Sequence, residues 1–178
     1  MPPRTADISP LFTGQVQNTP VGDLWIATSP LGLVSVSWAA DQNEFNEYLF
    51  RRFKRPAVLN PTESALIREQ IEEYLGGNRR VFTFPIDWSV LRPFQRAVLK
   101  ITFNIPYGQT RTYQELADEI GNPNAARAIG RAQATNPMPL VIPCHRVIGS
   151  DSKLKGYGGG SGLPTKEWLL KMEGAVIA

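Results

Sequence analysis

The apolar residues at the start of the chain predict short strands. Leu24–Ile26 and Leu33–Trp38 flank the turn-forming stretch Ser29–Gly32, which predicts two strands that pair across a turn. Residues 81–88 form a third strand-like run. Residues 1–20 are rich in Pro, Thr and Gln, and we expect them to form a loose arm.

Helical spacing appears next. Asp41 can cap a helix whose apolar residues recur every three or four positions, namely Phe45, Tyr48, Leu49 and Phe53. Asn60-Pro61 opens a second helix, and Gly76-Gly77 ends it with a left-handed cap. The predicted buried side of this helix consists of Leu66, Ile67, Ile71, Tyr74 and Leu75. Because this half contains no catalytic motif, we interpret it as a small α/β scaffold.

From residue 89 onward the pattern changes to helices separated by turns. Pro93 opens a helix that carries Phe94, Val98 and Leu99, and Ile105–Gly108 then makes a turn. A final helix is predicted from Lys166 to about Glu173. We therefore expect an α+β fold of two domains, an α/β domain at residues 1–88 and a mostly helical domain at residues 89–178.

A helix-turn-helix pattern lies within the second half. Thr112 and Glu115 form a capping box, in which each side chain bonds the backbone N–H of the other residue, so a helix begins there. Gly121 ends it, and Asn122-Pro123 opens the next helix over residues 124–134. One face of that helix is Ala and Gly. Such a face suits close approach to a DNA groove and suits tight helix packing equally well, so both interpretations stay open.

The charge is distributed unevenly between the halves. Residues 1–88 carry 8 Lys and Arg against 10 Asp and Glu, a net charge of −2, whereas residues 89–178 carry 11 against 6, a net charge of +5. The second half is therefore the better candidate for a surface that binds a polyanion. A charge of this size is also common in proteins that bind no nucleic acid, so the partner stays open.

The composition of the 178 residues, 42% hydrophobic and 20% charged, is typical of a globular protein. No apolar run approaches the roughly 20 residues that span a bilayer, and the N-terminus lacks a secretory signal pattern. One cysteine excludes an internal disulfide and favours a reducing compartment. One cysteine and one histidine also argue against a Cys/His zinc site, although a site of carboxylates alone stays open.

The candidate chemistry centres on the only cysteine, Cys144. Prolines at 137, 139 and 143 constrain the backbone before it, and His145 and Arg146 follow. A nearby base and positive charge raise the fraction of thiolate, the reactive form. Neighbouring side chains point in different directions, so we expect His145 to act through a water, with a carboxylate orienting its far nitrogen. A buried inert cysteine is the alternative.

A glycine-rich loop follows at residues 155–162. It can bring backbone N–H groups close to a planar ligand, and Tyr157 adds a ring and a hydroxyl. A flexible surface loop explains the same composition equally well.

Short motifs follow one another along residues 93–174. They lie at residues 105–108, 113–117, 121–123, 125–130, 136–137, 142–148, 156–157, 166–170 and 173–174. Together they resemble the O6-alkylguanine-DNA alkyltransferase family, and Pro143-Cys144-His145-Arg146 is the most specific of them. The first half resembles the family only in length and strand-helix layout. The resemblance implies a ribonuclease H-like first domain and a winged-helix-like second domain.

The resemblance also implies catalytic roles. Cys144 corresponds to the alkyl acceptor, His145 to the base that activates it through a water, and Glu173 to the carboxylate that orients the histidine. Asn136 corresponds to a hinge residue between the recognition helix and the cysteine segment. Tyr113 corresponds to the tyrosine that donates to guanine N3 and crowds the target phosphate.

The guanine pocket implied by the resemblance is lined by Tyr157 and by backbone groups near Val147 and Gly158, with Pro139 next to it. Gly158 stands where some members have serine, so a side-chain contribution is lost there while the backbone N–H remains. The position of Pro139 leads us to expect that bulky groups such as benzyl are accepted. The zinc ligands that some members carry in the first domain are absent.

Contacts to DNA are implied for four further residues. Arg127 corresponds to the finger that fills the vacancy left by a flipped base, and Gln114, Asn122 and Ser150 correspond to positions that contact the DNA backbone. In this family the helix-turn-helix enters the minor groove.

The implied function is DNA repair by a methylated-DNA–protein-cysteine methyltransferase. It moves an alkyl group irreversibly from O6-alkylguanine, and also from O4-alkylthymine, in double-stranded DNA to Cys144 after base flipping, once per molecule. We expect a cytoplasmic monomer, nucleoid-associated in a prokaryote, with no cofactor, metal or membrane partner. Two alternatives stay open: a sensor that binds alkylated DNA without repairing it, and a Cys-His hydrolase with multiple turnover.

Overall fold

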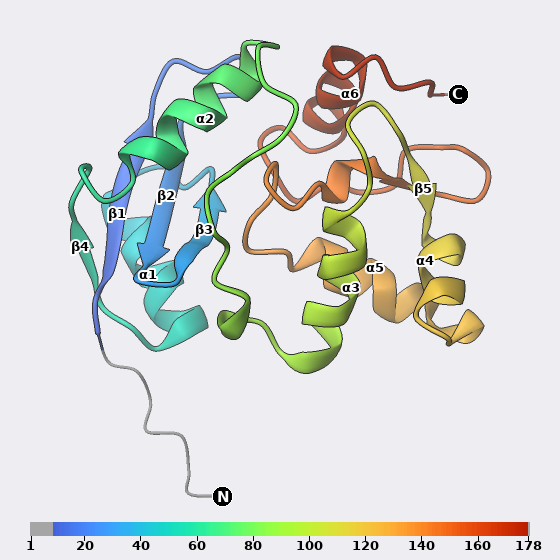
Figure 1. Ribbon diagram of the computed structural model, residues 1–178, viewed down its shortest axis with the longest axis horizontal. Helices are drawn as coiled ribbons and strands as arrows, with labels where there is room; N and C mark the ends of the chain where they lie inside the picture. Colours follow the sequence, from blue (N-terminus) through green and yellow to red (C-terminus); the bar gives the residue numbers. More distant parts are fainter. Residues whose placement is uncertain (1–8, 178) are drawn as a thin grey trace, which may run out of the picture.

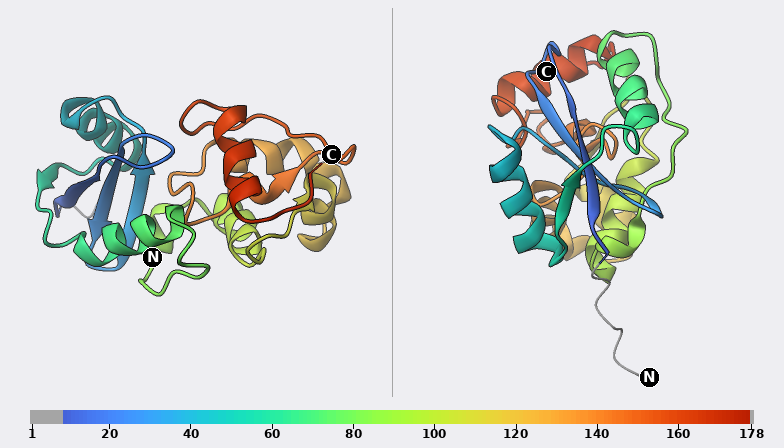
Figure 2. Two further views of the ribbon diagram at one scale, coloured as in Figure 1. Left: turned by 90° about the horizontal axis from the view of Figure 1, so that it is seen from above. Right: turned by 90° about the vertical axis from the view of Figure 1, so that its left-hand side faces the viewer.

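The computed structural model describes residues 9–177, which form two units lying side by side (Figures 1 and 2). The first unit is a four-stranded sheet with one helix on each face, as the right-hand view of Figure 2 shows. Its elements in chain order are β1 (Leu11–Val16), β2 (Leu24–Ser29), β3 (Gly32–Ser37), α1 (Gln42–Phe53), β4 (Ala57–Leu59) and α2 (Ala65–Leu75).

The sheet has the strand order β3-β2-β1-β4, in which β1 pairs antiparallel with β2 and parallel with β4. Side chains of a strand alternate between the two faces of its sheet. In β2, Leu24 and Ile26 therefore pack in the cluster that contains α2, whereas Trp25 packs against Phe45 of α1. This strand is buried along its whole length, which explains its near-continuous apolar sequence.

Several predictions for this unit are confirmed and others are wrong. The predicted turn joins β2 and β3, Asp41 caps α1, and Gly77 takes the left-handed backbone conformation after α2. The loose arm is wrong for residues 11–16, which form β1, while residues 1–8 lie outside the described residues. The run at 81–88 is not a strand, because Pro85 lacks an N–H and only Ile86 forms an isolated bridge, with Leu33. Leu66, expected to be buried, is 54% exposed.

The second unit is mostly helical, as predicted. Its elements are η1 (Trp88–Val90), α3 (Pro93–Phe103), β5 (Arg111–Thr112), α4 (Tyr113–Glu119), η2 (Pro123–Ala125), α5 (Ala126–Ala134), η3 (Cys144–Arg146), β6 (Val147–Ile148) and α6 (Leu163–Met172). The capping box of Thr112 and Glu115 is present at the start of α4. Gly121 has φ 78° between the two helices of the predicted pair, whose second helix begins with the 3-10 turn η2.

The main hydrophobic core crosses from one unit into the other. Val36 of β3 and Ile71 of α2 share a buried cluster with Met138 and Ile142 from the cysteine segment and with Leu169 of α6. In addition, the backbone N–H of Val36 donates to Pro137 O at 2.9 Å. The first unit therefore sets the position of the segment that leads to Cys144.

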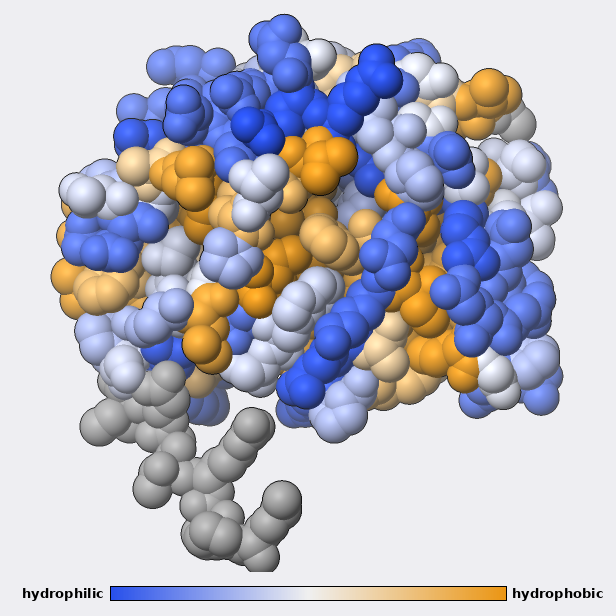
Figure 3. Space-filling model, in the orientation of Figure 1, coloured by the Kyte–Doolittle hydropathy of each residue, from blue (hydrophilic) through white to orange (hydrophobic). Residues whose placement is uncertain are grey.

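The surface mixes polar and apolar side chains. On the face seen in Figure 3, apolar groups form several patches separated by hydrophilic ones. Among the residues that the structure describes, no helix is both long and apolar enough to cross a membrane.

Candidate active site

Cys144 begins a single 3-10 turn that connects the proline-rich segment to β6. The turn is held by Arg146 N, which donates to Pro143 O at 2.9 Å, and β6 then pairs in parallel with β5. The cysteine is 8% exposed. It is therefore held inside the protein, at the start of a turn.

His145 points away from the cavity and contacts two side chains. Its Nε2 lies 2.9 Å from Glu173 Oε1, and Tyr74 Oη lies 3.2 Å from the same nitrogen. Tyr74 donates its hydroxyl proton to Glu173 Oε1 at 2.5 Å. The predicted pairing of His145 with Glu173 is thus present in the structure, with a third member that comes from α2 of the first unit.

Arg146 holds Glu173 from the other side. Its Nε and Nη2 donate to the two carboxylate oxygens, each at 2.9 Å, and its Nη1 donates to Ile105 O at 2.6 Å. Gly108 N adds a donor at 3.2 Å to Glu173 Oε2. A Cβ at Gly108 would lie 2.9 Å from Glu173 O, and its φ is 78°, so only glycine fits there. We call these five residues, Tyr74, Gly108, His145, Arg146 and Glu173, the Glu173 network.

The ionisation of this network assigns the histidine tautomer. Burial opposes ionisation of Glu173, but hydrogen bonds from His145 and Arg146 outweigh it and hold the pKa of the carboxyl well below its usual range. An ionised carboxylate only accepts, so His145 Nε2 carries a proton and donates. Burial also lowers the pKa of His145, which keeps the ring neutral. The lone pair is then on Nδ1, which is buried and has no hydrogen-bond partner among the described residues.

Burial and the neighbouring polar groups act on the Cys144 thiol in opposite directions. Burial raises the pKa of Cys144, although a hydrogen bond from Asn136, the charge of Lys166 and backbone N–H groups oppose this. Desolvation outweighs the positive surroundings of the thiol. Cys144 and His145 rest as a neutral pair.

Lys166 is a buried cation that the sequence did not single out. It is 0% exposed, and its Nζ donates to Val147 O at 2.6 Å and to Lys155 O at 3.0 Å. Burial lowers its pKa to about 8, and the proximity of Cys144 opposes that change. Lys166 thereby ties α6 to β6 and to the glycine-rich loop.

Asn136 follows α5 directly and fixes the start of the cysteine segment. Its Nδ2 donates to Ile142 O and its Oδ1 accepts from Met138 N, both at 2.9 Å. The side chain thus spans the loop that separates α5 from Cys144, and its role as a hinge stays a prediction.

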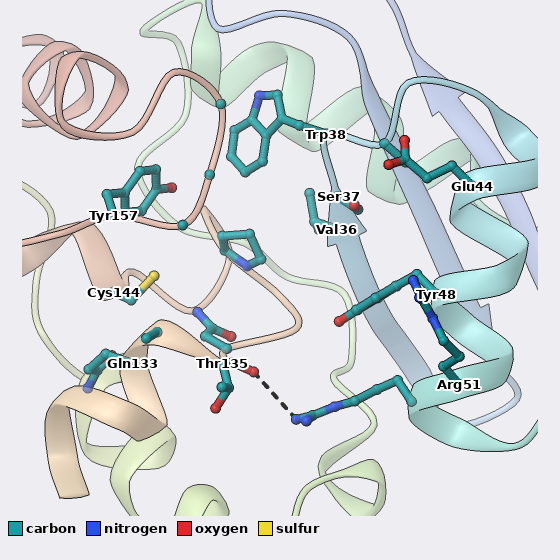
Figure 4. A pocket seen from close by; sticks show the side chains of 18 residues that line it. Val36, Ser37, Trp38, Glu44, Tyr48, Arg51, Gln133, Thr135, Cys144 and Tyr157 are labelled. Carbon is teal, nitrogen blue, oxygen red and sulfur yellow. Dashed lines mark hydrogen bonds between the residues drawn. The ribbon is translucent and has the colours of Figure 1, made fainter.

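Two cavities meet at Cys144. The first, which we call the base cavity, has a volume of about 300 Å³ and includes Tyr113 and Gly130. The second, the interdomain cavity, has a volume of about 560 Å³ and reaches Trp38 and α1 of the first unit (Figure 4). Both cavities share Gln133, Ala134, Cys144, Tyr157 and Gly158.

Pocket residues expected from the sequence are placed unequally around these cavities. Tyr157 and Gly158 line both cavities, and Pro139 lines the interdomain cavity. Val147 lines neither: its side chain packs in the core of the helical unit, and its carbonyl accepts from Lys166. The scaffold interpretation of the first unit is too narrow, since Trp38 forms part of the wall.

The residues expected to contact DNA are all exposed. Arg127 lies in the first turn of α5, and Asn122 and Ser150 lie in loops. Gln114 is engaged within the helix pair, because its Nε2 donates to Asp118 Oδ1 and to Pro123 O, each at 3.0 Å. Their contacts with DNA stay a prediction.

The fold and the site define a two-unit protein with a helix pair in its second unit and one buried cysteine between two cavities. The family description "6-O-methylguanine DNA methyltransferase, DNA binding domain" matches residues 93–175, and "6-O-methylguanine DNA methyltransferase, ribonuclease-like domain" matches residues 15–88. The chain belongs to the 6-O-methylguanine DNA methyltransferase family.

Individual relatives span nearly the whole chain. The methylated-DNA–protein-cysteine methyltransferase of Shigella flexneri is 35% identical over 89% of this chain and 94% of its own length. The protein of that name from Methanosarcina acetivorans is 37% identical over 88% of this chain and 95% of its own. The crystal structure of Mycobacterium tuberculosis OGT in complex with DNA has a TM-score of 0.75 and 34% identity, and covers 92% of both chains.

These findings confirm the family resemblance, the α+β fold and the predicted enzyme class. They place the protein in DNA repair by alkyl transfer, with DNA as its partner. The predicted domain limits, residues 1–88 and 89–178, stay a prediction.

Proposed function

We propose that this protein takes an alkyl group from O6 of guanine in double-stranded DNA onto Cys144, irreversibly and once per molecule. One observation carries the proposal. Cys144 lines a cavity large enough for a base, and the next residue is a histidine whose Nε2 is fixed on Glu173 and whose Nδ1 is free to accept a proton. This is the arrangement of a nucleophile with an oriented base.

The transfer is a displacement at carbon. The Cys144 thiol gives its proton, through a water, to His145 Nδ1, and the thiolate attacks the alkyl carbon. The S–C bond forms as the C–O6 bond breaks, and the electron pair of that bond passes to guanine O6. The base then takes up one proton, so the products are a thioether and unmodified guanine. Glu173 stabilises the imidazolium that forms in between.

Tyr113 is proposed to stabilise the leaving base. It lines the base cavity beside Cys144, and burial raises its pKa, so its hydroxyl stays protonated as a donor. A donor aimed at the charge that develops on guanine N3 lowers the barrier for transfer. Backbone groups of the glycine-rich loop are the other candidate donors.

Access to O6 requires the base to leave the duplex, at a cost of a few kcal/mol that is smaller for a damaged pair. Arg127, exposed at the start of α5, is proposed to occupy the space left in the stack. Gln114, Asn122 and Ser150 are proposed to contact the DNA backbone, which gives binding with little sequence preference. O4-alkylthymine presents a similar carbon-oxygen bond and is a second candidate substrate.

The test is intact mass spectrometry after incubation with a duplex that contains one O6-methylguanine. We expect the protein to gain the mass of one CH2 group on the peptide that contains Cys144, with one lesion repaired per molecule. An unmodified protein that binds the lesion tightly would indicate a sensor instead. Repeated turnover of an ester or amide would indicate a hydrolase.

A further inference from the structure

The two cavities at Cys144 offer separate places for the two parts of a large lesion. The base cavity has Tyr113 on its wall, which suits the guanine ring, while the interdomain cavity opens on the other side of the shared residues. In a displacement at carbon, the attacking sulfur and the leaving oxygen lie in line. Any group carried by that carbon must therefore extend sideways, into space that the base does not fill.

The size of the interdomain cavity exceeds what a methyl group needs. Its volume of about 560 Å³ lies within the range of pockets that hold drug-sized ligands. Aromatic rings line its middle. Trp38 lies edge-on to Tyr157 with ring centroids 6.3 Å apart, and its Nε1 donates to Val21 O at 2.8 Å, which holds the indole in place.

The far wall is formed by α1 and carries a free cation. Tyr48 and Arg51 come from this helix, one turn apart, and Figure 4 shows the Tyr48 hydroxyl directed into the cavity. Arg51 forms no ion pair or side-chain hydrogen bond with the residues that the structure describes. By contrast, Arg52 donates to Gln95 Oε1 at 3.0 Å, and the carboxylate of Glu44 accepts from the backbone N–H of Ala40.

We propose that the interdomain cavity receives long O6-substituents, with an aromatic part beside Trp38 and a terminal carboxylate that Arg51 recognises. The proposal rests on the alkyl transfer proposed above and narrows its substrate class. Burial raises the pKa of Tyr48, so its hydroxyl is a neutral donor for the same carboxylate. The first unit then contributes to lesion choice as well as to the position of the cysteine segment.

The experiment compares matched duplexes by the rate at which Cys144 becomes alkylated, followed by intact mass. The substituents are methyl, para-carboxybenzyl, para-carbamoylbenzyl and para-aminomethylbenzyl, with carboxymethyl and carbamoylmethyl as a short pair that lacks the ring. The variants are Arg51→Gln and, as a control with the same charge change, Arg68→Gln on α2, which lines neither cavity.

We expect the wild type to react about threefold faster with para-carboxybenzyl than with its amide, the size of a partly solvated ion pair. Arg51→Gln brings that ratio close to one and leaves the ratio of the short pair unchanged, while Arg68→Gln alters neither ratio. Equal rates for the long pair in the wild type, a preference that survives Arg51→Gln, or a fastest reaction with para-aminomethylbenzyl would overturn the proposal. Failure of the wild type to react with O6-methylguanine would instead overturn the proposed function.

Discussion

The two sides of Cys144 are built in opposite ways. Behind it, the Glu173 network gives both carboxylate oxygens two or more donors, all of them buried or nearly so. In front, Tyr157 and Gln133 line both cavities, and Tyr157 Oη and Gln133 Oε1 are buried and have no partner among the described residues. Buried polar groups are normally satisfied, so unsatisfied ones on a cavity wall indicate where a ligand belongs. The back of the site fixes geometry, and the front is left for the substrate.

The strongest way to separate the two sides is Cys144→Ala. The sulfur faces the cavities and accepts no hydrogen bond that holds the Glu173 network together. We therefore expect complete loss of transfer, with unchanged affinity for a duplex that carries O6-methylguanine, measured by gel shift at one fixed salt concentration. A large loss of binding would mean that the cysteine also supports the fold.

Glu173→Gln should disrupt the Glu173 network behind Cys144. The amide leaves Arg146 buried without its counter-charge, and one oxygen is lost as an acceptor. We expect the free energy of unfolding, from urea titration, to fall by about 3 kcal/mol. The transfer rate should fall about 100-fold, because the base loses its orientation. Glu167→Gln, which removes only the exposed pair with Lys171 on the same helix, should change neither.

The stabilisation that Glu173→Gln removes should depend on pH. The pKa of Glu173 in the fold lies below its ordinary value of 4.5, so ionised Glu173 stabilises the folded state. That stabilisation is fully present above about pH 4.5 and is lost as the pH falls further. The difference in unfolding free energy between the wild type and Glu173→Gln should therefore shrink below that pH. A difference that stays constant would place the carboxylate outside the pairing described here.

Arg127→Ala tests the front of the site where it meets DNA. Loss of the side chain that fills the stack should slow transfer about tenfold, a part of the few kcal/mol that base extrusion costs. Affinity for the duplex should also decrease, with a weaker salt dependence, because one cation is removed. Equal repair by the variant and the wild type would contradict the finger role.

Tyr74→Phe makes the smallest expected change, at the back of the site. The phenol donates to Glu173 Oε1 at 2.5 Å, so its loss leaves more of that charge to His145 and should raise the pKa of the ring. The chain has one histidine, so a single imidazole signal in NMR reports this shift directly. Transfer should slow about threefold and stability should fall by about 1.5 kcal/mol. An unshifted imidazole would show that Tyr74 only fills space.

Much of this molecule could be predicted from local signals in the sequence, whereas contacts between distant residues could not. The capping box at Thr112 and the cap at Asp41 depend on residues three apart, so the sequence displays them. In the sequence, Tyr74 looks like one more apolar position on a helix. Its hydrogen-bond partners, His145 and Glu173, are 71 and 99 residues away. Lys166 gave no signal either, because nothing in a sequence marks a lysine whose ammonium group meets two carbonyls inside the core.

The first half illustrates the same limit. β1 was hidden in a stretch rich in Pro, Thr and Gln because its pairing partners, β2 and β4, decide its conformation. The Cys144, His145 and Glu173 grouping came from the family resemblance, whereas the neutral state of Cys144 follows from its burial in the folded protein. The burial of this one thiol depends on how distant segments pack around it, which the sequence does not display.

Trp38 has a practical consequence. Its indole is fixed by Val21, and a Cβ at Gly159 would lie 2.4 Å from its ring, so the glycine-rich loop touches it directly. Of the four tryptophans, only Trp38 lines either of the two cavities. Its fluorescence is thus a built-in optical reporter, which lets arrival of a lesion be followed in real time without attaching a dye.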